Sequence, residues 1–235
     1  MKNFRFIFVC LLAVIVSSCQ QKAPAELTGL RCEMLSNPLG IDCSNPHLSW
    51  EIIGSQRDIR QTEYRIIVAS SPEKLNNDEG DLWDSGTVPS DVSSQVQYGG
   101  KALESRAQCF WKVQITTNKG ESAWSKPACW TMGLLNDSDW QAQWTGLDKS
   151  FEYDSPDAPH TRLSARYFRK EFTSGNTVKK AVLYISGLGL YKLYVNGKEI
   201  GEQELSPTPT DYTKSVKYNT FDVTNSIQKK TNTLG

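Results

Sequence analysis

Apolar and polar residues alternate along short segments between residues 27 and 133. Leu48, Trp50 and Ile52 fall on one face of an extended segment, and Ser49 and Glu51 fall on the other. The same period of two recurs at Tyr64, Ile66 and Val68, and again at Trp111, Val113 and Ile115. Turn signals separate the segments, among them Asn37-Pro38, Asn45-Pro46, Ser71-Pro72 and Asn118-Lys119-Gly120. Short alternating strands with such breaks predict a β-sandwich over residues 27–133.

Strand signals continue in residues 165–235, after a polar connector over 134–164. Asn196-Gly197 is the strongest short hairpin signal in the chain, because both turn positions must accept a positive φ. We expect residues 198–200 to run back along residues 193–195. The segment from Val182 to Ile185 is apolar on both faces, which predicts a strand inside a packed sandwich.

The amino terminus carries the features of an export signal. Lys2 and Arg5 precede an apolar run from Phe6 to Val16, which is too short to span a bilayer. We therefore predict a signal peptide over residues 1–18 and a polar tether over 19–26. The remaining length accommodates two domains of roughly 100 residues each, or one larger domain.

Small residues lead from this apolar run directly into Cys19. This arrangement resembles the lipobox of bacterial lipoproteins, which implies cleavage before Cys19 and acylation of that cysteine. Several acyl chains would then hold the protein on a membrane. The predicted location is the bacterial cell envelope, with the periplasmic and surface faces both open. The alternative is an ordinary secretory signal in which Cys19 is incidental.

Composition excludes several classes of function. The 26 basic and 26 acidic residues balance, and no basic patch is present, which argues against nucleic acid as a partner. Two histidines and no metal-spaced cysteines rule out most metal chemistry, so no metal ligand and no cofactor are predicted, and calcium binding stays open. Cys32 and Cys43 are too far apart in sequence to form a zinc knuckle.

Cys109 and Cys129 flank a plausible hairpin in a compartment that permits disulfides. Whether they face each other depends on register, because a slip of one residue puts them on opposite faces. A disulfide and a pair of small buried thiols both stay open, with the thiols favoured.

The ordered segments of the second half carry a family resemblance. Residues 184–191 (YISGLGLY) and 194–201 (YVNGKEIG) resemble the amino-terminal jelly-roll domain of bacterial α-L-rhamnosidases, and residues 205–212 and 218–224 continue that pattern in order. Residues 33–50 resemble the fibronectin type III-like domain that precedes it in many such enzymes. Asp139-Trp140 with Gln143-Trp144 is similar to the joint between the two.

The fold implied by the resemblance is all-β. A fibronectin type III-like sandwich is followed by an incomplete jelly roll of the galactose-binding type. Only five or six strands can be counted from Arg166, whereas a jelly roll closes with about eight. We therefore expect residues 134–235 on their own to be poorly soluble or loosely packed.

The resemblance also implies an activity, that of inverting exo-glycosidases which remove terminal α-L-rhamnose from glycans. Such a reaction needs two carboxyl groups flanking the scissile bond. In the family these lie on a helical barrel downstream of both β-domains, so no catalytic residue is assigned in this chain. Asp154 with Asp157, and Glu202 with Glu204, are interpreted as solvated surface charges.

Three functions follow from these observations. The first is the amino-terminal accessory region of a lipid-anchored α-L-rhamnosidase, inactive alone, whose partners are a rhamnose-containing glycan and the C-terminal catalytic domain that is expected to be missing from this chain. The second is a stand-alone carbohydrate-binding lipoprotein, for which Tyr191, Asp211 and Tyr212 are candidate sugar contacts because they lie at turns. Structural roles are favoured for these three residues. The third, the joint region of a β-galactosidase-like enzyme, is disfavoured by the fibronectin-like domain.

Overall fold

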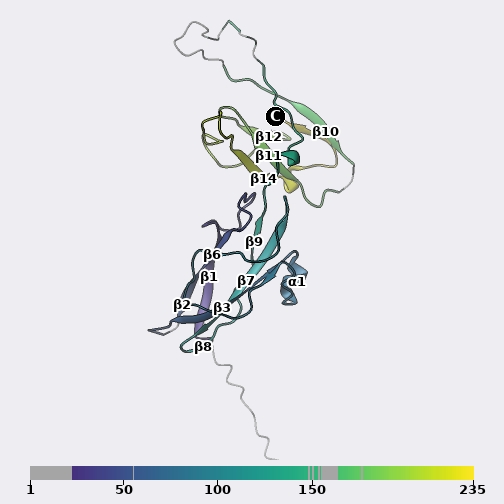
Figure 1. Ribbon diagram of the computed structural model, residues 1–235. Coiled ribbons are helices and arrows are strands. Elements are labelled where there is room, and N and C mark those ends of the chain that lie inside the picture. Colours follow the sequence, from purple (N-terminus) through teal and green to yellow (C-terminus); the bar gives the residue numbers. More distant parts are fainter. Residues whose placement is uncertain are drawn as a thin grey trace, which may run out of the picture.

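The computed structural model describes residues 23–54, 56–147, 149, 151–152, 154, 164–175 and 177–235. Nearly all the regular structure in these residues is β. Figure 1 shows two β-domains arranged end to end, the first from purple to teal and the second from green to yellow. The predicted all-β fold is confirmed.

The first domain packs two antiparallel sheets against each other. One sheet has the order β1-β2-β6, formed by β1 (Ala25–Cys32), β2 (His47–Gly54) and β6 (Val96–Gln97). In the other sheet, β3 (Gln61–Ala69) pairs along its length with β7 (Gln108–Thr117). Four shorter strands extend this second sheet, namely β4 (Trp83–Asp84), β5 (Val88–Pro89), β8 (Gly120–Glu121) and β9 (Ala128–Thr131).

The alternating pattern of the sequence explains the core of this domain. Trp50 in β2 is 3% exposed, whereas its neighbour Glu51 is exposed, as a period of two requires. The inward residues of β3 and β7 meet it from the opposite sheet, and they include Ile66, Val68, Trp111, Val113 and Ile115. The predicted inward faces of all three segments are therefore confirmed.

The α-helix α1 (Pro72–Asn76) begins where the sequence pattern predicted only a turn. Ser71 caps it, because its hydroxyl accepts a hydrogen bond from the Lys74 N–H at 3.3 Å. Proline at the first helical position is compatible with this start, since its missing N–H has no partner there anyway. Leu75 then packs against Ile67 on the outer side of β3.

The cysteines of the first domain lie out of register with each other. Cys109 in β7 faces Trp130 in β9, and Phe110 faces Cys129. Neighbours along a strand point to opposite faces, so the two thiols do not meet. All four described cysteines are free, and burial raises the pKa of Cys109 to about 12. The favoured interpretation as buried thiols is confirmed for Cys109, and Cys129 is a free thiol that is only half-buried.

The second domain contains a four-stranded and a two-stranded sheet in the described residues. The larger has the order β10-β15-β12-β13, formed by β10 (Lys170–Ser174), β15 (Lys230–Leu234), β12 (Leu193–Val195) and β13 (Lys198–Ile200). The smaller pairs β11 (Val182–Ser186) with β14 (Tyr218–Asp222). Two short 3-10 turns, η1 (Asp137–Asp139) and η2 (Thr224–Ser226), lie between strands.

The predicted hairpin at Asn196-Gly197 is confirmed. Both turn residues have positive φ, at 52° and 78°, and Val195 lies opposite Lys198. The expectation for β11 is wrong in one respect, since all five of its residues are only half-buried. Among the described strands β11 pairs with β14 alone, so its apolar faces are only partly covered.

Candidate functional site

Tyr191 is half-buried and its hydroxyl is engaged in a local network. It donates a hydrogen bond to Asn219 Oδ1 at 2.8 Å, and Ser206 Oγ donates to the same oxygen at 2.9 Å. The Tyr191 N–H also donates to the Ser206 carbonyl at 3.0 Å. Burial raises the pKa of Tyr191 to about 12. The network braces two loops against each other, which is a structural use of this side chain.

Asp211 organises a turn through its carboxylate. Oδ1 accepts hydrogen bonds from Thr213 Oγ1 at 2.6 Å and from the Thr213 N–H at 3.1 Å, and Lys214 Nζ lies 3.3 Å from Oδ2. These contacts, Thr213 first, lower the pKa of Asp211. Tyr212, which follows it, is 41% exposed. Tyr212 thus offers more open surface than Tyr191, and sugar contact at the three residues stays a prediction.

The predicted lipidation site, Cys19, lies outside the described residues. Nothing in the structure therefore bears on the anchor. Within the part of the chain that is described, no helix combines the length and apolar character needed to cross a bilayer.

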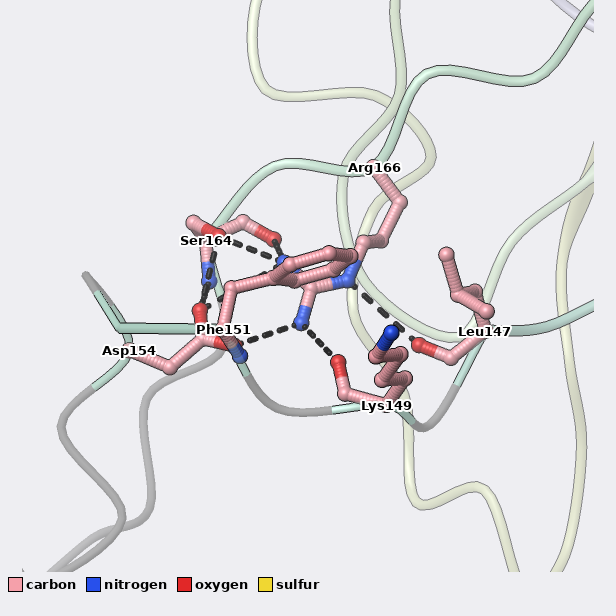
Figure 2. A network of polar contacts seen from close by, with 6 residues as sticks. All are labelled: Leu147, Lys149, Phe151, Asp154, Ser164 and Arg166. Atoms are coloured by element: carbon pink, nitrogen blue, oxygen red, sulfur yellow. Dashed lines mark hydrogen bonds and ion pairs between the residues drawn. The ribbon is translucent and has the colours of Figure 1, made fainter.

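A buried ion pair between the predicted connector and the start of the second domain was not expected from the sequence (Figure 2). The Asp154 side chain is fully buried and that of Arg166 is 11% exposed. Arg166 Nη2 lies 2.8 Å from Asp154 Oδ2, and the guanidinium carbon sits 4.9 Å from the centre of the Phe151 ring. Ser164 donates to Asp154 Oδ1 from its N–H and from its hydroxyl, both at 2.7 Å.

The remaining groups around this pair are also satisfied. The Phe151 N–H donates to Asp154 Oδ2 at 2.8 Å, and Arg166 donates to the carbonyls of Lys149 and Leu147 at 3.0 and 3.4 Å. Arg166, followed by Ser164, holds the pKa of Asp154 well below its usual range. A carboxylate that is held ionised by contacts on both oxygens is unsuited to proton transfer. The ion pair therefore has a structural role, which is to fix the connector against the start of the second domain.

The interpretation of Asp154 as a solvated surface charge is therefore wrong. Its carboxylate became buried because Arg166, twelve residues away, folds back over it. Asp157 lies outside the described residues. Glu202 and Glu204 are exposed as expected, and Glu204 lies 3.4 Å from Lys192 Nζ.

The pKa values of other carboxyl groups are shifted in the same direction as that of Asp154. In the described chain, the carboxyl groups with clearly shifted pKa values are all shifted downward by hydrogen bonds or cations; they are Glu73, Asp81, Asp84, Asp139, Asp154, Glu199, Asp211 and Asp222. A glycosidase acid needs the opposite shift, because it must stay protonated near neutral pH. No group of three or more His, Cys, Asp or Glu side chains in the described residues is placed to hold a metal ion.

A groove of about 390 Å³ lies beside the start of β1 in the first domain. It is lined mainly by residues 23–27, by Ile53 and Gly54, and by residues 123–126, including Trp124. None of the three candidate sugar contacts borders it. Its two charged lining residues are Glu26 and Lys126, and both are exposed.

Comparisons with known families match both domains. The family of Rha78A-like, N-terminal immunoglobulin domains matches residues 27–136. The alpha-L-rhamnosidase N-terminal domain family matches residues 176–235. The first match covers the two packed sheets of the first domain, and the second begins between β10 and β11 of the second domain.

Curated relatives and solved structures agree with the family matches. An α-L-rhamnosidase of Formosa agariphila is 33% identical over 100% of this chain and 27% of that protein. One of Alteromonas sp. is 36% identical over 98% of this chain and 26% of that protein. The solved structure of an α-L-rhamnosidase from Dictyoglumus thermophilum has a TM-score of 0.79 at 38% identity, covering 89% of this chain and 24% of that one.

This chain spans about a quarter of the length of those relatives. The part of this chain that aligns with them includes both of its domains. The two domains of this chain belong to the amino-terminal region of the α-L-rhamnosidases.

Proposed function

We propose that this chain is the amino-terminal, non-catalytic region of an α-L-rhamnosidase that a lipid at Cys19 anchors to the cell envelope. The observation that carries the proposal is the succession of two rhamnosidase N-terminal domains along the chain. The downward pKa shifts of the described carboxyl groups support a non-catalytic role. Removal of terminal α-L-rhamnose with inversion would then be performed by a catalytic domain outside residues 1–235.

An exchange experiment tests the accessory role directly. In the Dictyoglumus thermophilum relative, the aligned amino-terminal quarter would be replaced by this chain, with deletion of the same quarter as the control. We expect the chimera to release rhamnose from an aryl α-L-rhamnoside while the deletion variant does not. A chimera that folds but has no more activity than the deletion would contradict the proposal.

The purified chain on its own should release no rhamnose above the background of an empty preparation. That chemistry needs one carboxyl group that stays protonated near neutral pH and one that is ionised. The clearly shifted pKa values of carboxyl groups in the described residues, such as those of Asp81 and Asp154, all lie below their usual range. Detectable turnover by a preparation free of host glycosidases would contradict the non-catalytic role.

Anchoring at Cys19 is tested by metabolic labelling with a clickable fatty acid. We expect label on the parent chain and none on Cys19→Ser. Cys43→Ser is the matched control, because Cys43 is an exposed free cysteine of the first domain and should leave the label unchanged. Label that persists in Cys19→Ser would rule out this anchor.

The alternative, a stand-alone carbohydrate-binding lipoprotein, is favoured by one observation. Tyr212 is 41% exposed beside a turn that Asp211 holds in shape, and an open aromatic ring can stack on a sugar face. Affinity electrophoresis in rhamnose-bearing polysaccharide tests it. Retardation that Tyr212→Ala removes and Tyr194→Ala keeps would support this function, and an unretarded parent chain would contradict it.

A further inference from the structure

The two domains meet at Tyr218, the first residue of β14. The backbone N–H of Leu134, at the end of the first domain, donates a hydrogen bond to the Tyr218 hydroxyl oxygen at 2.9 Å. The Trp140 ring meets the Tyr218 ring edge to face, with centroids 5.3 Å apart and planes at 84°. One side chain of the second domain thus makes a polar and an aromatic contact with the chain that leaves the first.

A second contact lies beside it on the neighbouring strand. Tyr184 in β11 has its ring centre 6.2 Å from that of Tyr218, and the Arg106 guanidinium carbon lies 5.9 Å from the Tyr184 ring. Arg106 is itself fixed, because Nη2 donates to the Asp139 carbonyl at 2.9 Å and Nη1 lies 3.3 Å from Asp139 Oδ1. The cation is therefore held in place over the ring.

Two glycines leave no room for a side chain at this joint. A Cβ on Gly133 would lie 2.2 Å from the Tyr218 hydroxyl oxygen and 3.0 Å from the Gly40 carbonyl oxygen. A Cβ on Gly40 would lie 2.2 Å from Thr220 Oγ1, also in β14. Gly40 has a φ of 75°, which already favours glycine, but the φ of Gly133 lies outside the left-handed region. At Gly133 the tightest contact is the Tyr218 hydroxyl of the second domain, and the Gly40 carbonyl of the first domain adds a second one.

We propose that these contacts lock the two domains into one rigid body, with Tyr218 as the positioning residue. Domains joined by a single connector move relative to each other by default unless contacts at their interface hold them, as a large hydrophobic interface does. Here a hydrogen bond, an edge-to-face aromatic pair, a held cation and two glycine contacts act on the same pair of strands. The first domain then acts as a rigid spacer. It fixes the orientation of the second domain relative to residue 23, where the described part of the chain begins.

This inference stands apart from the proposed glycosidase role, because it concerns contacts within the described chain. In a membrane-anchored protein, a rigid spacer would hold whatever follows the second domain at a defined orientation. A flexible joint would instead let it sample many orientations.

Backbone ¹⁵N relaxation of the whole chain tests the rigid joint. We expect amides of β3 and β7 to report the same overall correlation time as amides of β12 and β15. Gly133→Ala should split this value into two shorter correlation times, because the new methyl group displaces Tyr218. Gly175→Ala is the matched control, since a Cβ there meets nothing within 4 Å.

A second substitution separates the contact from a general need for glycine. Tyr218→Phe removes the oxygen that lies 2.2 Å from the new methyl group, so Gly133→Ala should do less damage in that background than in the parent. Tyr194→Phe is the matched tyrosine control, because Tyr194 lies on β12 and makes none of the joint contacts described above.

The outcomes divide cleanly. If adding Tyr218→Phe to Gly133→Ala partly restores a common correlation time, the proposal is supported. If Gly133→Ala instead unfolds the second domain, recovery of its fold in the double variant supports the proposal in the same way. Two separate correlation times in the parent chain would overturn it. Equal damage by Gly133→Ala in both backgrounds would also overturn it, because the glycine would then serve some other purpose.

Discussion

The two domains differ in how completely they bury their apolar residues. The first has a continuous core that runs from Trp50 through Trp111 to Trp130, with all three indoles at most 3% exposed. In the second, the buried apolar side chains among the described residues are Leu193, Val195 and Val223. Four of the five residues of β10 are exposed, including Phe172 at 37%.

This difference shows that two domains with similar strand patterns need not be equally able to fold on their own. Both domains are built from short strands in two sheets, but in the described residues the first fills its interior with a large buried apolar cluster, whereas the second buries few apolar side chains. The second has six described strands, whereas a jelly roll has about eight. Its contacts with the first domain therefore represent a larger share of what holds it together. Four predictions test this contrast.

Separating the domains should have the largest effect. We expect residues 23–136 alone to unfold cooperatively in urea, because their core is complete. Residues 134–235 alone should lack a cooperative transition and bind a hydrophobic dye, because the apolar faces of β11 are only partly covered. Circular dichroism in the near ultraviolet and urea unfolding measure both. A sharp transition in the isolated second domain would contradict the contrast.

Removing a large side chain from the core of the first domain should have a smaller effect than separating the domains, but should still lower the free energy of unfolding substantially. Trp111→Ala is expected to lower the free energy of unfolding of the first domain by about 3–5 kcal/mol, since it removes a fully buried indole. Trp111→Phe is the control and should cost less, because the indole N–H of Trp111 has no hydrogen-bond partner in the described structure. A loss below about 1 kcal/mol for Trp111→Ala would mean that the core is loosely packed.

Acid should weaken the first domain through Asp81. Partial burial opposes ionisation of this carboxyl, but Lys74 Nζ at 2.7 Å and the Ser70 N–H and hydroxyl outweigh it and lower the pKa to about 2, from 3.8. The folded state thus favours the ionised form, so this stabilisation is present above about pH 4 and is lost as the pH falls toward 2.

We expect the loss to be about 1–2 kcal/mol, after allowance for the partly exposed side chain. Urea unfolding at about pH 5 and about pH 2.5 measures it in the parent and in Asp81→Asn. The variant should lose correspondingly less stability between the two pH values, whereas Asp91→Asn, at an exposed loop position, should follow the parent. Identical pH dependence in the parent and Asp81→Asn would contradict the assignment.

The smallest effect is expected in the second domain's hairpin. Gly197→Ala should cost about 1 kcal/mol, because φ is 78° there and a Cβ would be strained although it meets no neighbour within 4 Å. The change is read from the midpoint of thermal unfolding of the whole chain, monitored at amides of β12 and β13. Gly175→Ala, with open space and an ordinary φ, should leave that midpoint unchanged.

Several local features could be predicted from the sequence alone. The inward faces of Trp50 and Trp111 follow from a period of two, and the hairpin at Asn196-Gly197 follows from the φ values that those residues tolerate. The helix α1 was missed although Ser71-Pro72-Glu73 is a recognisable start, because the same residues also suit a turn.

The contacts that no local sequence pattern predicts join residues from different elements. Asp154 reads as one acid among several in a polar loop, and only the return of Arg166 buries it. Asp139-Trp140 could be recognised as part of the joint by resemblance. The contact of Trp140 with Tyr218 could not be predicted, because Tyr218 lies 78 residues further along the chain.

By itself, the amino-acid sequence determined the alternating strands of the first domain, their inward faces and the hairpin at Asn196-Gly197, because these depend on side-chain alternation and on the backbone angles that individual residues tolerate. Only the tertiary structure decided which charge is buried, whether Cys109 meets Cys129, and why Gly133 has no room for a side chain. Each of these depends on register or on an approach in space between distant segments, and no local pattern encodes such a distance.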